Sequence, residues 1–232
     1  MKMPRFNKLP EEFQCDEVKL YYDILKTKTA SLVMKRIFDI VISLLFIILM
    51  ALPMAVIAVL IKATSKGPVI YKQVRVTAFN KTFRIFKFRS MRVDADKKGE
   101  LLTVGEDDRI TKVGKFIRKF RLDEFPQIFH VLSGKMTIVG TRPEVEKFTS
   151  VYTKEMLATL LLPAGVTSLA SIKFKDEAKL LESSTNVDET YINVILPEKM
   201  KYNLEYIRNF SFSSDIKLII KTVAEVFSSR GE

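Results

Sequence analysis

Residues 40–61 read IVISLLFIILMALPMAVIAVLI, a stretch of 22 residues without a charged side chain. On length alone, this stretch suffices for a helix that crosses a bilayer. It does not resemble a signal peptide, because more than thirty residues precede it and many of them are charged. A core helix of this length without a polar face would be unusual in so small a protein. The sequence therefore predicts a segment inserted in a membrane.

Both flanks of this stretch carry cations, Lys35 and Arg36 before it and Lys62 and Lys66 after it. Basic residues favour the cytoplasmic side of a membrane, so both ends are expected there. Pro53 removes a backbone donor and divides the stretch into pieces of 13 and 8 residues. As helices these pieces would reach roughly 20 and 12 Å, and neither crosses a hydrocarbon core of about 30 Å. The pattern favours a re-entrant helix–break–helix, with a kinked true span as the alternative.

Asp39 stands at the mouth of the apolar stretch, shortly after Lys35 and Arg36. A carboxylate at this depth is expected to pair with a cation. We therefore predict an ion pair between Asp39 and one of these two residues, and assign it to Arg36 and Asp39.

The charge of the chain is unevenly placed. The 232 residues carry a formal charge of +11. Residues 62–121 hold 17 Lys and Arg against 6 Asp and Glu, so this belt accounts for the whole excess. Such a belt attracts nucleic acid, anionic headgroups or phosphorylated small molecules, unless it serves only as a solvated surface. Cys15 and His130 are the only residues of their kinds, which argues against a disulfide, a zinc site or a Ser-His-Asp triad. Any metal would be bound by oxygen, which favours Mg²⁺ or Mn²⁺.

Two further patterns predict secondary structure beyond the apolar stretch. β-Branched and aromatic residues over 69–76 and 82–89, joined by a short linker, predict a β-hairpin. Residues 115–132 predict two short amphipathic helices that meet at the sequence LDEFP, suited to a membrane surface or to a core. The tail from residue 213 predicts a helix with Ser213 or Ser214 as its N-cap. Residues 134–143 read as a turn-rich loop.

The predicted fold class is α+β and mainly helical. It combines a re-entrant membrane helix–break–helix, interfacial amphipathic helices and a small β-hairpin. The predicted divisions are an N-terminal appendage over 1–31, the re-entrant membrane helix over 32–66, a catalytic domain over 67–200 and a C-terminal helical segment over 201–232.

The sequence LDEFPQ, residues 122–127, places the adjacent carboxylates Asp123 and Glu124 just before Pro126. Proline belongs near a helix start and aspartate is a good N-cap, so Asp123 could simply cap a helix and complement its dipole. The functional alternative is a corner that handles phosphate, because helix N-termini and nearby arginines bind anions. A carboxylate belongs in such a site if a metal offsets it or if it attacks phosphorus. Neighbouring cations would then keep Asp123 ionised.

Several motifs in order along residues 32–227 resemble the bacterial sugar transferase family, the small monotopic phosphoglycosyl transferases. The Pro-interrupted apolar run is one of them. The others are KRIFD at 35–39, GPVIYKQVR at 67–75, FRIFKFRSM at 83–91, DDRIT at 107–111, LDEFPQ at 122–127, VLSGKMTIVGTRP at 131–143 and PAGVT at 163–167.

This resemblance implies an enzyme of the bacterial inner membrane, monotopic, with its active site facing the cytoplasm. Such an enzyme transfers a sugar 1-phosphate from a UDP-sugar to undecaprenyl phosphate, releases UMP and uses Mg²⁺. The reaction is the first membrane step of surface glycan assembly.

The resemblance also implies roles for individual residues. Asp123 would attack the sugar-linked phosphorus and contact the metal, and Glu124 would assist the acceptor or the metal. A larger loss is therefore expected on changing Asp123 than on changing Glu124. The candidates for substrate binding are Arg142, Lys87, Arg89, Arg118, Arg109 and Gln127.

A membrane-tethered protein that binds anionic lipid or nucleic acid without catalysis is the alternative function. It predicts binding that weakens with salt and does not depend on Asp123. Under the enzymatic hypothesis the expected partners are the UDP-sugar, undecaprenyl phosphate and the bilayer, with no nucleic acid. The terminal segments also suggest self-association.

Overall fold

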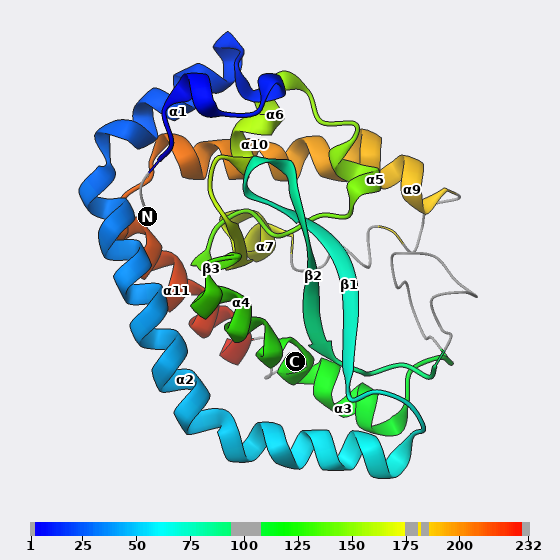
Figure 1. The fold of residues 1–232 in the computed structure, drawn as a ribbon. Coiled ribbons are helices and arrows are strands. Elements are labelled where there is room, and N and C mark those ends of the chain that lie inside the picture. The colour runs from blue at the N-terminus through cyan, green and yellow to red at the C-terminus, as the bar shows by residue number, and fades with distance from the viewer. Residues whose placement is uncertain (1–2, 94–107, 175–180, 182–185, 229–232) are drawn as a thin grey trace.

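A computed structural model describes residues 3–93, 108–174, 181 and 186–228. The longest element is α2 (Thr29–Thr64), which runs down one side of the molecule and then turns beneath it (Figure 1). By length and composition, α2 could cross a membrane, and only 11% of its most apolar window is buried. A core helix of a soluble protein would be mostly buried, so this apolar surface requires a cover of lipid or protein. Residues 90–114, rich in Asp, Lys and Gly, read as a loop in the sequence, and their part at 94–107 lies outside the described residues.

The helix does not break at Pro53. The chain is helical on both sides of this residue, so the prediction of a helix–break–helix is wrong as secondary structure. The helix bends instead, as Figure 1 shows. A proline inside a helix removes one hydrogen bond and clashes with the preceding turn, which bends the axis without ending the helix. We call residues 29–52 the first limb of α2 and residues 54–64 the second limb.

The predicted β-hairpin is confirmed. Strand β1 (Ile70–Thr77) pairs antiparallel with β2 (Lys81–Phe88), in a register that places Ile70 opposite Phe88 and Lys72 opposite Phe86. In Figure 1 the hairpin rises from the second limb of α2 toward the helices at the other end of the molecule. Its base is fixed by an apolar cluster that joins Phe88 to the second limb and to helix α3 (Lys112–Lys119).

The N-terminal segment is not an appendage. Phe13, Tyr21 and Leu25 are fully buried and belong to the largest apolar cluster, together with Leu161 and Ile207 from distant parts of the chain. Removing large side chains of this kind from a core costs several kcal/mol, about 3–5 for Phe→Ala. The predicted boundary at 31/32 therefore divides one packed unit. The boundary at 200/201 falls inside helix α10 (Leu196–Arg208).

A parallel strand pair was missed by the sequence patterns, which indicated turns and loops there. Strand β3 (Met136–Val139) pairs with β4 (Ala164–Thr167). Just beyond β3, the backbone passes so close to β4 that a Cβ on Gly165 would lie 2.3 Å from backbone atoms of Gly140. Only glycine permits this approach.

The C-terminal helix α11 (Phe212–Ser228) confirms the predicted tail helix, but the cap differs. The Oγ of Ser211 accepts a hydrogen bond from the backbone N–H of Ser214 at 3.1 Å, so Ser211 caps the helix in place of Ser213 or Ser214. The helix lies beside α2 in Figure 1. The remaining elements are η1 (Phe6–Lys8), η2 (Glu11–Phe13), α1 (Asp16–Thr27), η3 (Ala78–Asn80), α3 (Lys112–Lys119), η5 (Leu122–Gln127), α4 (Ile128–Ser133), α5 (Glu146–Thr149), α6 (Lys154–Leu157), η6 (Ala158–Leu160), α7 (Leu169–Lys173), α9 (Val187–Thr190), the π-helical η7 (Tyr191–Ile195) and α10 (Leu196–Arg208).

Candidate active site

The adjacent carboxylates Asp123 and Glu124 lie in the first turn of η5, between α3 and α4. Arg121 turns the chain into η5 with a left-handed backbone, at φ 56°. Asp123 lies in the first turn of the helix and not at its cap, so the alternative that it simply caps a helix is wrong. The two short helices predicted to meet at LDEFP are confirmed as α3 and η5–α4. Carboxylates in a first turn still interact favourably with the helix dipole.

Glu124 is held by two cations from distant parts of the chain. Its Oε1 accepts from Lys87 Nζ of β2 at 2.8 Å and also forms an ion pair with the guanidinium of Arg142. Burial alone would raise the pKa of Glu124, but Arg142 and Lys87 outweigh it and hold this pKa well below its usual range. The Glu124 carboxylate is thus ionised and fixed in place. We call Lys87, Asp123, Glu124 and Arg142 the corner cluster.

Asp123 differs from Glu124 in its hydrogen bonding and in the direction of its pKa shift. It is buried, at 8% exposed, yet within the described residues the structure gives its carboxylate no hydrogen-bond or ion-pair partner. Burial and the negative charge of Glu124 raise its pKa, and nearby cations, Lys87 first, only partly offset this. The cations favour the ionised form of Asp123, as expected, but burial and Glu124 outweigh them, so its pKa is raised overall. An unbonded, desolvated carboxylate is a stronger nucleophile than a solvated one.

Gln127 and Arg118 border the same corner. Gln127 is 2% exposed, and its Nε2 lacks a hydrogen-bond partner within the part of the chain that the structure describes. In a 3₁₀ helix, residues three apart lie on one side, so Gln127 shares a side with Glu124. Arg118 of α3 is close enough to Asp123 to lower its pKa. A buried donor without a partner is unfavourable unless a ligand or water satisfies it.

Arg89 and Arg109 are placed elsewhere. The guanidinium of Arg89 is buried and donates to the carbonyl oxygen of Ser65 at 2.9 Å and to its Oγ at 2.7 Å, at the end of α2. Arg109 precedes Ile110, which forms a β-bridge with Met91, and its carbonyl accepts from the Arg92 N–H at 2.8 Å. The observed contact of Arg89 stabilises the end of α2. A role for either residue in substrate binding stays a prediction.

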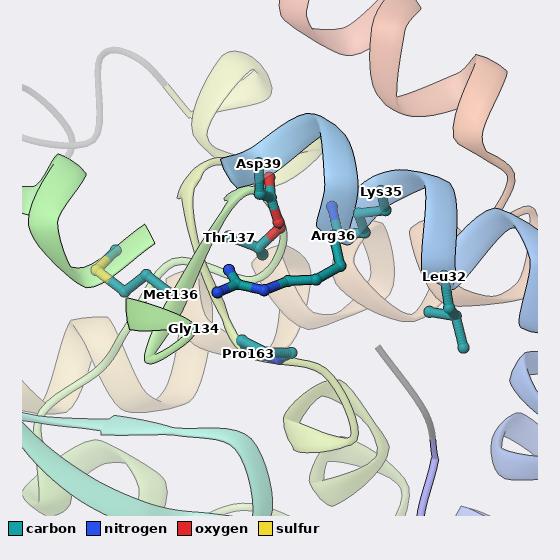
Figure 2. Close-up of a pocket in the computed structure, with 8 residues that line it drawn as sticks. All are labelled: Leu32, Lys35, Arg36, Asp39, Gly134, Met136, Thr137 and Pro163. Carbon is teal, nitrogen blue, oxygen red and sulfur yellow. The ribbon is translucent and has the colours of Figure 1, made fainter. Parts of the chain in front are cut away.

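The predicted ion pair between Arg36 and Asp39 is wrong. Arg36 donates to the carbonyl oxygens of Val131 and Leu132, each at 2.7 Å, where it complements the negative C-terminal end of α4. Figure 2 shows this side chain reaching across a cavity of about 130 Å³ toward Gly134. The carboxylate of Asp39 instead accepts from Thr137 and Ile138 of β3.

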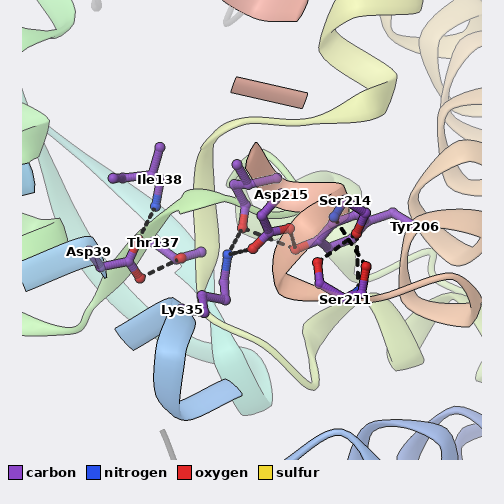
Figure 3. Close-up of polar contacts among 9 residues, drawn as sticks. Lys35, Asp39, Thr137, Ile138, Tyr206, Ser211, Ser214 and Asp215 are labelled. Carbon is purple, nitrogen blue, oxygen red and sulfur yellow. Dashed lines mark hydrogen bonds and ion pairs between the residues drawn. The ribbon is translucent and has the colours of Figure 1, made fainter. Parts of the chain in front are cut away.

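A buried network around Lys35 was not found from the sequence. Lys35 Nζ pairs with Asp215 Oδ2 of α11 at 2.6 Å and donates to the carbonyl oxygen of Val139. The hydroxyl of Tyr206 donates to Asp215 Oδ1 at 2.8 Å (Figure 3). We call Lys35, Tyr206 and Asp215 the anchor cluster. It ties the first limb of α2 to the C-terminal helices.

The described residues contain no group of three or more His, Cys, Asp and Glu side chains that could hold a metal by itself. Mg²⁺ in enzymes of phosphate chemistry is commonly bound through one or two carboxylates together with substrate phosphates. The unbonded carboxylate of Asp123 fits that mode. Mg²⁺ stays a prediction, in which substrate phosphates and water would supply the other ligands.

Residues 30–229 match the family model described as bacterial sugar transferase. The chain belongs to the bacterial sugar transferase family. The match covers both limbs of α2, the hairpin, the corner cluster and α11.

Named relatives have related activities. The chain is 38% identical over 205 residues to a UDP-glucose:undecaprenyl-phosphate glucose-1-phosphate transferase of Klebsiella pneumoniae, covering 86% of this chain and 41% of that protein. It is 35% identical over 200 residues to a UDP-N-acetylgalactosamine-undecaprenyl-phosphate N-acetylgalactosaminephosphotransferase of Aeromonas hydrophila, covering 85% and 44%. A putative undecaprenyl-phosphate N-acetylgalactosaminyl 1-phosphate transferase of Bacillus subtilis is 42% identical over 147 residues, covering 62% and 80%. The chain thus spans less than half of the first two relatives.

Proposed function

We propose that this protein transfers a sugar 1-phosphate from a UDP-sugar to undecaprenyl phosphate at the cytoplasmic face of a bacterial inner membrane. The observation that carries the proposal is the contrast within the corner cluster, where Glu124 is fixed by Lys87 and Arg142 while the buried Asp123 carboxylate has no bonding partner among the described residues. The family match and the names of the relatives support the same reaction class.

In the first step, an Asp123 oxygen attacks the sugar-linked phosphorus, and the bond from that phosphorus to the oxygen bridging it to UMP breaks. UMP leaves with the bonding electrons, and the sugar phosphate remains on Asp123 as an acyl phosphate. In the second step, an oxygen of the acceptor phosphate attacks the same phosphorus and releases Asp123. The acceptor needs little activation, because a phosphate monoester has its second pKa near 6 and is mostly ionised at neutral pH.

Lys87 and Arg142 would hold the phosphate groups of the donor beside Asp123, and Glu124 would hold these two cations in position. The buried Nε2–H of Gln127 could donate a hydrogen bond to an oxygen of the UDP-sugar. Mg²⁺, bound through Asp123 and the substrate phosphates, would neutralise the pyrophosphate charge. The bend of α2 at Pro53 supports a re-entrant placement, in which the second limb returns toward the same membrane face.

UMP release from a panel of UDP-sugars, with Mg²⁺ and with or without undecaprenyl phosphate, tests this function. We expect UMP to be released from one UDP-sugar of the panel, and repeated turnover to require undecaprenyl phosphate. It also expects a phosphosugar adduct on the intact protein, seen by mass spectrometry before the lipid is added. Failure of every donor with folded protein in lipid would instead favour a tethered protein that binds anionic lipid without catalysis.

A further inference from the structure

An apolar groove of about 560 Å³ lies between the second limb of α2 and the hairpin. Its walls include Met54, Ala55 and Ala58 of α2 and Phe86 and Phe88 of β2. The volume lies in the range of pockets that bind small molecules. Because the facing limb is itself exposed and apolar, the groove adjoins the surface that a bilayer would cover.

The groove also reaches the reacting corner. Pro126 of η5 forms part of its wall. Asp123 stands three residues earlier in the same 3₁₀ helix, where residues three apart lie on one side. One end of the groove is therefore a single helical turn from the unbonded carboxylate. A chain lying in it could bring its head group to Asp123 without leaving the apolar surface.

Among the described residues, Lys72 is the charged member of the wall. It is exposed, and its Nζ lies 5.5 Å from the centre of the Phe86 ring. A cation at the border of an apolar groove suits a ligand with a phosphate head and a hydrocarbon tail. The lining thus provides both parts of the recognition that a lipid phosphate requires.

We propose that this groove binds the isoprenoid units nearest the phosphate of the polyprenyl acceptor, with Lys72 attracting that phosphate. This assignment rests on the proposed function and gives a binding site to its second substrate. The expected occupant of the groove is the acceptor lipid. A bulk phospholipid acyl chain in the same groove is an outcome that the test distinguishes.

The test uses the full chain in lipid nanodiscs and compares Ala55→Phe with Ala63→Phe. Both alanines are exposed in the second limb, and only Ala55 lines the groove. Adduct formation from the donor and discharge of the adduct to undecaprenyl phosphate are measured separately. For Ala55→Phe, discharge should slow by about tenfold or more relative to adduct formation, as when a pocket for an apolar chain is partly filled. Ala63→Phe should keep the wild-type ratio of the two rates.

Equal slowing of both steps by Ala55→Phe, or no change in their ratio, would overturn the groove assignment. An absent adduct in the wild type would instead overturn the proposed function, so the two failures are distinguishable. Lys72→Met should raise the KM for undecaprenyl phosphate more than Lys81→Met, a matched change at the far end of the hairpin. Equal KM values would remove Lys72 from the proposal.

A photoreactive polyprenyl phosphate, with a diazirine in its first isoprene unit, tests the wild-type protein directly and does not depend on the folding of variants. Labelling is expected within residues 54–58 or 86–88. Unlabelled undecaprenyl phosphate should compete, and phosphatidylglycerol should not. Labelling elsewhere, or equal competition by phosphatidylglycerol, would show that the groove takes lipid without selecting the acceptor.

Discussion

The corner cluster is partly buried and the anchor cluster is buried, and both combine carboxylates with a lysine, yet they differ in which groups they leave unbonded. In the anchor cluster, both oxygens of Asp215 are used, one by Lys35 and the other by Tyr206. In the corner cluster, one carboxylate takes both cations and its neighbour Asp123 is left without a partner in the described part of the chain. A saturated network is suited to holding helices together, whereas an unbonded buried carboxylate is suited to chemistry.

The largest effect is expected from Asp123→Asn. The amide cannot attack phosphorus, so adduct formation should fall by about 10⁴-fold or more, as for loss of a nucleophile in other enzymes. Stability should not fall, because a raised pKa means that burying the charged form is unfavourable at neutral pH. Adduct yield by mass spectrometry and urea unfolding would measure the two effects. Asp188→Asn, at an exposed ion pair, is the control. Loss of folding together with activity would contradict this separation of roles.

Lys35→Met should have the opposite effect from Asp123→Asn, with a loss of stability in place of a loss of chemistry. It leaves Asp215 buried beside Tyr206 without its cation, which is expected to lower the free energy of unfolding by about 3–5 kcal/mol. Burial already raises the pKa of Asp215 despite Lys35, so the carboxylate is held at a cost. The double variant Lys35→Met/Asp215→Leu should recover most of the loss, since no charge is then buried.

Urea unfolding in detergent would check this prediction, with activity measured at low temperature. Lys147→Met is the matched control, because its exposed ion pair with Asp188 should contribute less than about 1 kcal/mol. A stability loss in Lys35→Met no larger than in this control would show that the anchor cluster does not hold the fold.

Glu124→Gln should have an intermediate effect on activity. The amide keeps the shape but weakens the hold on Lys87 and Arg142, so adduct formation should slow by about 10²–10³-fold, the size seen for loss of one electrostatic contact. The change should appear in kcat more than in the KM for the donor, because the two cations remain. Steady-state kinetics would separate these parameters. A loss equal to that of Asp123→Asn would contradict the assignment of Asp123 as nucleophile and Glu124 as positioning residue.

Local patterns predicted the parts of the molecule that depend on neighbouring residues. The apolar helix, the hairpin, the tail helix and the pair Asp123–Glu124 all follow from runs of a few residues. The sequence did not predict the anchor cluster, because Lys35 and Asp215 are 180 positions apart and no periodicity links them. Nor did it predict that Glu124 would take both cations and leave Asp123 unbonded. Such pairing is decided by tertiary packing.

The smallest and sharpest test of the contrast is the pH dependence of adduct formation. The attacking carboxylate must be ionised, so the rate should fall as pH decreases through the pKa of Asp123, at a pH above that of an ordinary aspartate. Burial and then Glu124 raise this pKa, while Lys87 lowers it. Glu124→Gln should therefore move the acidic limb of the profile to lower pH.

Lys87→Met should move the same limb to higher pH, because it removes a cation that favours the ionised form. Single-turnover rates at constant Mg²⁺ would measure both shifts, with Lys147→Met as a control that should move neither. Because the two variants alter the same ion pair, a merely structural role would shift both profiles alike or leave both unchanged. Opposite shifts would show that the charge of Glu124 raises the pKa of the attacking carboxylate and that the charge of Lys87 lowers it, as expected for Asp123.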